Sequence, residues 1–263
     1  MKLGPVGRVL WSAYMVLILG FLLAPLVFVV YYSFLPTAFF KLEWQGFSLR
    51  WYEAFFASDV FMSALWNTLT IALLVVPVTL IVALPTTHMM ANGQLKWLGQ
   101  ALTIPVIVPG VVTGIALMGL FAMLGMDNAY LRLILGLTLF CLPFTMRAIN
   151  AVYSSLDRRP EEAARDLGAG PVRTYMQITL PQLKAGILSG AILAFVEAID
   201  NFSIAVFMAD TSTKTLPIAA YEHIRDFDDP TVAAMSTLLI GLAFLLVVVL
   251  EKTVGLEKMI RQG

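Results

Sequence analysis

Residues 161–181 read EEAARDLGAGPVRTYMQITLP, a polar stretch between long apolar segments of the chain. A short helix is predicted to begin near Glu161, because Pro160 is tolerated in a first helical turn and the neighbouring acids suit the positive end of the helix dipole. No other extended hydrophilic run of helical composition occurs in the second half of the sequence.

A turn and a second short helix are predicted to follow. Gly168 and Gly170 allow the turn, since glycine adopts backbone angles that other residues avoid. Pro171 can start the second helix, and Pro181 is expected to end it. Two small helices that meet at a glycine elbow would suit a docking surface. An ordinary charged loop between two membrane spans is the alternative that composition alone leaves open.

The composition is that of a polytopic membrane protein. Of the 263 residues, 59% are hydrophobic and only 13% are charged, with a mean hydropathy of +0.85; a soluble domain carries about a quarter charged residues. The formal net charge is zero, so the overall charge does not indicate a nucleic-acid partner. The single cysteine, Cys141, excludes a disulfide within the chain.

Six apolar segments are each long enough to cross a bilayer, which needs about 20 residues. Cytoplasmic loops carry excess Lys and Arg, and placing both termini in the cytoplasm puts 12 of the 17 Lys and Arg on that side. We therefore predict an all-α integral membrane protein, a single transmembrane domain over residues 1–263, with both termini and the loop at 157–184 cytoplasmic. The six predicted spans are residues 9–32, 62–87, 98–124, 129–150, 186–208 and 231–251.

The third predicted span is interrupted by two prolines. Pro105 and Pro109 stand four residues apart and remove backbone donors, which disfavours a straight helix. Irregular backbone at membrane depth is tolerated only against protein or a water-filled cavity. A translocation path is therefore predicted to pass these prolines, although simple structural bends would also explain them.

The fifth predicted span contains two acids. Glu197 and Asp200 are three residues apart and Asn201 follows, so all three are predicted to share one helical face. Glu197 would lie about 15 Å along the helix, near the bilayer midplane. A charge there costs about 2.5–3.5 kcal/mol, which argues against exposure to lipid. We favour a cation site or gate along a pathway; a hydrogen-bond cluster between helices is the alternative.

The polar stretch that opens this section matches the pattern E-A-A-x3-G-x9-I-x-L-P at every position, from Glu162 to Pro181. The chain thereby resembles the permease subunits of ATP-binding-cassette importers, the type I importers that depend on a solute-binding protein. Over nearly its full length it is similar to the spermidine/putrescine type. The supporting stretches are Trp44-Gln45-Gly46-Phe47-Ser48, Trp51-Tyr52, Asn67-Thr68-Leu69, Cys141-Leu142-Pro143-Phe144, Leu216-Pro217 with Tyr221, and Ala233-x-x-Ser236-Thr237-Leu238-Leu239.

The resemblance implies a defined assembly in the bacterial inner membrane. Two permease subunits, identical or homologous, would form the pathway, an ATPase dimer would dock on the E-A-A loops, and an extracytoplasmic solute-binding protein would deliver the solute. Glu162 would be the acidic contact, Ala163 and Ala164 the close-packing face, and Gly168 the elbow. The residues expected to couple to the ATPase are Glu162, Ala163, Ala164, Asp166, Leu167, Gly168, Ile178, Leu180 and Pro181.

No enzymatic activity is expected of this chain. The sequence contains no G-x-x-x-x-G-K-[ST] phosphate-binding loop, so ATP and Mg²⁺ are expected on the partner ATPase, and no cofactor or metal on this subunit. The residues expected along the solute pathway are Glu197, Asp200, Asn201, Pro105 and Pro109.

The acids of the fifth span depart from the family pattern. Relatives commonly show Ser-Leu-Asp-Asp/Glu, whereas this chain has Ala198-Ile199-Asp200-Asn201 and a further acid at Glu197. The number of acids is retained, so a small cationic, polyamine-like solute fits, because an amine can pair directly with a carboxylate. The same subfamily includes permeases for ferric iron, opines and aminophosphonates, which remain alternatives.

The intramembrane acids and the two histidines leave two other classes of membrane protein to consider. A cation-coupled secondary transporter could use Glu197 and Asp200 as its carrier pair, but such folds often contain internal repeats, and no convincing repeat is seen. An intramembrane protease is disfavoured, because His88 and His223 are predicted on opposite sides of the membrane and the two acids share one helix.

Overall fold

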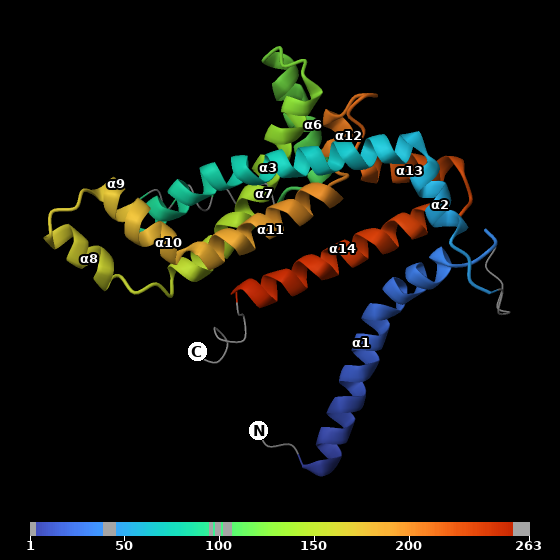
Figure 1. Ribbon diagram of the computed structural model, residues 1–263, viewed down its shortest axis with the longest axis horizontal. Helices are drawn as coiled ribbons and strands as arrows, with labels where there is room; N and C mark the ends of the chain where they lie inside the picture. Colours follow the sequence, from blue (N-terminus) through green and yellow to red (C-terminus); the bar gives the residue numbers. More distant parts are fainter. Residues whose placement is uncertain (1–3, 39–45, 95–96, 98–100, 102–106, 255–263) are drawn as a thin grey trace. The chain divides into compact units, whose positions relative to one another are not determined.

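The computed structural model describes residues 4–38, 46–94, 97, 101 and 107–254, coloured along the chain in Figure 1. Every regular element in these ranges is a helix, and no strand occurs among them. The prediction of an all-helical protein is therefore confirmed.

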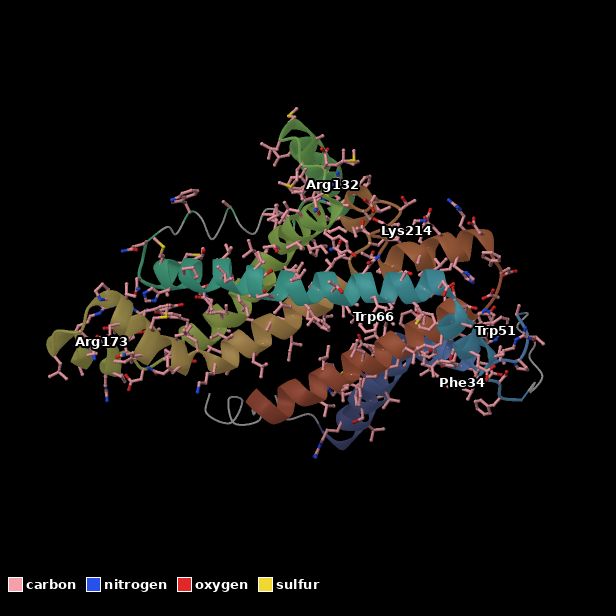
Figure 2. All side chains as sticks on the ribbon, turned by 45° about the horizontal axis from the view of Figure 1, so that its top comes forward. Phe34, Trp51, Trp66, Arg132, Arg173 and Lys214 are labelled. Atoms are coloured by element: carbon pink, nitrogen blue, oxygen red, sulfur yellow. The ribbon has the colours of Figure 1, made fainter. Side chains whose placement is uncertain are left out.

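The chain divides into two compact units, of which the first contains Met1–Met62 and Ala220–Leu242. Its long helix α1 (Pro5–Ser33) is followed by the short helix α2 (Arg50–Ala57). The Trp51 indole N–H donates to the Leu35 carbonyl at 2.6 Å, and this bond ties α2 to the end of α1 (Phe34 and Trp51 are labelled in Figure 2).

The second unit contains Ser63–Ala219 and Ala243–Gly263. Most of the residues expected to function lie in it. Helices α3, α13 and α14 each carry residues of both units. The remaining helices, in chain order, are α3 (Asp59–Ala91), α6 (Gly110–Met123), α7 (Ala129–Tyr153), α8 (Arg159–Asp166), α9 (Pro171–Thr174), η1 (Tyr175–Thr179), α10 (Leu180–Gln182), α11 (Lys184–Asp200), α12 (Ala205–Met208), α13 (Leu216–Asp226) and α14 (Thr231–Val254).

Helices α7 and α11 pack closely because two glycines of α11 face α7. A Cβ atom on Gly186 would lie 3.1 Å from the Ile149 Cα, and one on Gly190 would lie 3.0 Å from the Thr145 Cγ2. The Thr145 hydroxyl donates to the Gly190 carbonyl at 3.3 Å. Small residues four apart let helix backbones approach in this way. The spacing Gly186-x-x-x-Gly190 is the sequence signal for this packing, and it was missed.

Three helices of the described part are long and apolar enough to cross a membrane: Gly7–Ser33, Asp59–Ala91 and Ala129–Tyr153. The pair Pro171–Gln182 and Lys184–Asp200 passes the same test together but bends by 73°. Gly110–Met123 and Thr231–Leu246 are shorter apolar helices.

The predicted spans at 9–32, 62–87 and 129–150 therefore coincide with long helices. The prediction for 98–124 lies partly outside the described residues, and its described part forms α6. The segment 186–208 differs from a single helix, because α11 ends at Asp200 and α12 begins at Ala205. This break shapes the cavity described below.

Candidate functional site: the coupling segment and the acidic cavity

Helices α8 to α10, residues 159–182, are named here the coupling segment. In α8 the Pro160 ring lies in the first turn, followed by Glu161 and Glu162, which favour the helix N-terminus electrostatically. Glu162 is exposed, but Glu161 is only 6% exposed, and its carboxylate accepts a 2.5 Å hydrogen bond from the Thr179 hydroxyl. This bond joins α8 to η1. Glu161 was not among the predicted site residues, although two adjacent acids on a helix necessarily point in different directions.

The elbow of the coupling segment is at Gly168. Its φ of +84° lies in the left-handed region that residues with a Cβ rarely adopt. The Gly168 N–H bonds to the Arg165 carbonyl and the Ala169 N–H to the Ala164 carbonyl, both at 2.9 Å. These bonds satisfy the last carbonyls of α8. Gly170 then precedes α9, whose first turn contains Pro171.

The second arm of the coupling segment is longer than predicted. Pro181 was expected to end it, but the helix continues through Pro181 to Gln182. The preceding residues 175–179 form a π-helix, and the Leu180 N–H bonds to the Tyr175 carbonyl. A proline inside a regular α-helix loses one hydrogen bond and clashes with the preceding turn. The wider turn of the π-helix, which lies just before Pro181, explains how the helix can continue through this proline.

Apolar side chains point outward from the coupling segment although its composition is polar. Leu167 at the elbow is 89% exposed, and Val172 and Met176, four residues apart on one face, are 72% and 55% exposed. Arg173, labelled in Figure 2, stands beside them on α9. Among the predicted coupling residues, Glu162, Ala163, Asp166, Leu167 and Pro181 are exposed, and Ala164, Ile178 and Leu180 are partly buried.

The predicted acids line a cavity of about 390 Å³ in the second unit. Glu197, which is half-buried, and Asp200, which is exposed within this chain, lie on the last turn of α11. Pro109, which precedes α6, also lines the cavity; Pro105 lies outside the described residues. The acidic cavity is lined by Ile107, Val108, Pro109, Gly110, Phe140, Glu197, Asp200, Asn201, Phe202 and Ser203.

The prediction that Asn201 continues the helical face of the two acids is wrong. Helix α11 ends at Asp200, and Asn201 has φ −74° and ψ +100°. Its side-chain Oδ1 accepts a 3.0 Å hydrogen bond from the Ile204 N–H. An asparagine that bonds nearby backbone in this way favours a turn over a helix. Asn201 lines the acidic cavity from this turn rather than from the helix.

Helix α6 packs closely against the turn that follows α11 and against α12, at two glycines of α6. A Cβ on Gly110 would lie 2.8 Å from the Ser203 Cβ, and one on Gly114 would lie 2.6 Å from the Phe207 Cδ2 and 3.0 Å from the Ser203 carbonyl oxygen. Neither glycine can carry a side chain without displacing this turn. The contacts of Gly110 and Gly114 were not predicted from the sequence.

The C-terminal end of α12 is held by Arg132 of α7, labelled in Figure 2. Its guanidinium donates to the Met208 carbonyl at 3.3 and 3.4 Å and to the Met126 carbonyl at 3.3 Å. A cation suits the negative end of a helix.

Within the described residues, no group of three or more His, Cys, Asp or Glu side chains is arranged to hold a metal ion.

The chain is similar to permeases of known transport systems. It is 33% identical over 249 residues to the putrescine transport system permease protein PotI of Escherichia coli (strain K12), covering 90% of this chain and 88% of that protein. It is 30% identical over 241 residues to the spermidine/putrescine transport system permease protein PotC of Haemophilus influenzae, covering 90% and 93%.

A solved structure shares the fold. It is a bacterial ABC transporter involved in the import of the acidic polysaccharide alginate, with a TM-score of 0.75 at 18% identity, covering 96% of this chain and 99% of that one. Residues 83–254, which include both the coupling segment and the acidic cavity, match the family model. The chain belongs to the family of binding-protein-dependent transport system inner membrane components, the permease subunits of ABC importers.

Proposed function

We propose that this permease is coupled to an ATPase dimer through the coupling segment. The single observation that carries this proposal is the construction of that segment. Its two arms are tied internally by Glu161 and Thr179, while Leu167, Val172 and Met176 face outward. Exposed apolar side chains with a polar surround are typical of protein interaction sites. The internal bond would hold the two arms together when the segment moves, and the exposed apolar side chains would contact the ATPase.

The membrane arrangement that goes with this proposal has six spans and cytoplasmic termini in the bacterial inner membrane. The excess of Lys and Arg on the side of the termini supports this arrangement. The coupling segment would then lie in the cytoplasm. A second permease subunit, identical or homologous, would complete the pathway, and an extracytoplasmic solute-binding protein would deliver the solute. ATP and Mg²⁺ would bind to the ATPase, with no cofactor on this chain.

The solute that the acidic cavity suits best is a small organic cation of the polyamine type. Glu197 and Asp200 provide carboxylates for ammonium groups, and Phe140 and Phe202 provide aromatic rings that can attract a cation over their faces. The named cargoes of PotI and PotC are putrescine and spermidine/putrescine. Iron, opines and aminophosphonates are the competing cargoes within the same importer class.

The test of energy coupling is uptake of radiolabelled putrescine in cells whose partner ATPase carries a substitution of its phosphate-loop lysine. Accumulation should be lost, although this chain is still inserted at the normal level. Continued accumulation that collapses with the membrane potential would instead favour a cation-coupled secondary transporter that uses Glu197 and Asp200.

The test of cargo is competition. An excess of unlabelled spermidine should reduce putrescine uptake, whereas ferric citrate, octopine and 2-aminoethylphosphonate should leave it unchanged. Inhibition by one of these three in place of spermidine would assign the cargo to that compound.

A further inference from the structure

The C-terminal end of α3 meets the coupling segment through a group of polar and aromatic side chains that the proposal above does not use. The His88 Nδ1 lies 2.8 Å from the Tyr153 Oη, at the last residue of α7. The His88 ring also packs against Tyr175 of η1, with ring centroids 4.4 Å apart. The second ring nitrogen, Nε2, lies 3.2 Å from the Asn92 Nδ2. His88 thus touches two helices besides its own.

Arg158 provides a second contact between α3, α7 and the start of α8. Arg158, the residue that precedes α8, donates from Nη2 to the Ala91 carbonyl at 3.1 Å. Its guanidinium also stands over the Tyr153 ring, 5.8 Å from the centroid. Tyr153 is only 3% exposed. Arg158, which directly precedes the coupling segment, and Tyr175, which lies within it, therefore both contact residues at the C-terminal ends of α3 and α7.

The helices that receive these links are themselves packed together. An apolar cluster joins α3, α7 and the start of α11, and a displacement of one of these helices must move the others because interiors are close-packed. Its buried members are Ala83, Leu142, Met146, Ile149, Tyr153 and Leu183. Tyr153 belongs both to this cluster and to the contact with His88.

We propose that His88 is a positioning residue of the coupling step, which locks the coupling segment to α3 and α7 so that the segment moves with them. The inference rests on the proposed docking of the ATPase at the coupling segment. The bond to Tyr153 fixes the orientation of the His88 ring against Tyr175 of the segment. Without this bond the His88 ring is free to turn away from Tyr175, and the hydrogen bond from Arg158 to Ala91 is the link to α3 that is left intact. A movement of the ATPase then rotates the coupling segment relative to α3 and α7 instead of displacing these helices. ATP is hydrolysed, but the helices that line the solute pathway do not move.

The experiment compares five variants: His88→Leu, Tyr153→Phe, the double variant of these two, His88→Gln and Tyr130→Phe. The first two remove the bond; glutamine at 88 retains a group that can bond the Tyr153 hydroxyl. Tyr130→Phe is the matched control, because it removes one tyrosine hydroxyl of the same helix, bonded to Asn67 at 2.6 Å, far from the coupling segment in the sequence. Each importer is purified through a tag on this chain and reconstituted in phosphatidylethanolamine/phosphatidylglycerol liposomes.

The readouts are the ATPase retained per permease, the basal rate of ATP hydrolysis, and the factor by which solute-binding protein loaded with putrescine stimulates it. His88→Leu and Tyr153→Phe should retain the ATPase and the basal rate but reduce the stimulation about fivefold. The double variant should be no worse than His88→Leu alone, since His88→Leu already removes the bond to Tyr153. His88→Gln should restore most of the stimulation, and Tyr130→Phe should match the wild type.

The outcomes separate the two proposals. A wild-type importer that retains no ATPase overturns the docking proposal and the role of His88 with it. Retained ATPase with unchanged stimulation in Tyr153→Phe overturns the role of His88 alone. So does a parallel fall in basal and stimulated hydrolysis, which would mean that the side chains only support the fold. If His88→Leu fails to assemble, Tyr153→Phe, which removes a single oxygen atom, decides the question.

Discussion

The coupling segment and the acidic cavity are built in opposite ways. The coupling segment is one continuous run, 159–182, and its elbow at Gly168 and the helix starts at Pro160 and Pro171 follow from the backbone preferences of those residues. The cavity is lined by residues 107–110, 140, 197 and 200–203. It exists only because distant parts of the chain pack together.

This difference sets how each region should respond to substitution. A surface that binds a partner depends on a few side chains that carry most of the binding energy, so a charge placed at one of them should have a large effect and truncation of most others a small one. A cavity held open by close helix contacts has little tolerance, because adding even one methyl group displaces its wall. Substitutions in the two regions should therefore differ in the size of their effects.

The largest effect is expected at the elbow of the coupling segment. Leu167→Asp should reduce the ATPase that co-purifies with this chain by about tenfold or more, since a carboxylate would lose its hydration in the apolar contact. Leu167→Ala and Glu162→Ala should have smaller effects in the same assay, because they remove contacts without adding a charge to bury. Wild-type co-purification of the aspartate variant would show that the ATPase binds elsewhere.

The next largest effect is expected on solute uptake, when an acid of the acidic cavity is substituted. Asp200→Asn should lower putrescine uptake about tenfold, because it removes a charge-assisted pairing with the ammonium group. Asp127→Asn is the matched control, an exposed acid outside the cavity in the turn between α6 and α7. Uptake is measured at equal permease abundance with the ATPase still bound. Equal uptake by the two variants would make Asp200 a structural residue.

A smaller effect is expected where α6 closes on the turn after α11. Gly114→Ala should reduce uptake a few-fold, about 1 kcal/mol in free energy, because its Cβ would approach the Phe207 ring and the Ser203 carbonyl too closely. Gly119→Ala on the same helix is the control, because a Cβ there meets nothing within 4 Å among the described residues. If Gly119→Ala impaired uptake as strongly, helix flexibility rather than close packing would be the cause.

The smallest effect is expected at Tyr175. Its hydroxyl is buried, and within the described part of the structure no partner lies at hydrogen-bonding distance. Tyr175→Phe should therefore raise the free energy of unfolding by about 1 kcal/mol, since the phenylalanine ring has no hydroxyl to desolvate. Thermal unfolding of the purified importer should show a midpoint at or above the wild type. Tyr153→Phe, which breaks a bond, should shift it downward.

Much of the coupling segment could be predicted because its signals are local. Gly168 and Pro171 mark a turn and a helix start through their own backbone preferences, and both occur where they were expected. The role of Pro181 was missed, because the π-helix that accommodates it depends on how residues 175–179 are bonded. Glu161 was missed for a related reason: which of two adjacent acids is buried depends on what packs against the helix.

The cavity was predicted only in part. Glu197 and Asp200 stood out because acids are costly in an apolar segment. The end of α11 at Asp200 went unseen, since the apolar composition of residues 202–208 continues past it. The contacts of Gly110 and Gly114 with Ser203 and Phe207 could not be inferred either, because they join residues almost 100 positions apart.

By itself the sequence determined the helical class, the apolar segments, the glycine elbow and the acids of the cavity, because these follow from hydropathy and from the backbone preferences of single residues. Only the tertiary structure decided that Glu161 is buried against Thr179, that α6 closes on the turn after α11, and that His88 joins three helices. Such contacts depend on which surfaces meet, and side-chain packing between distant segments leaves no periodic pattern along the chain.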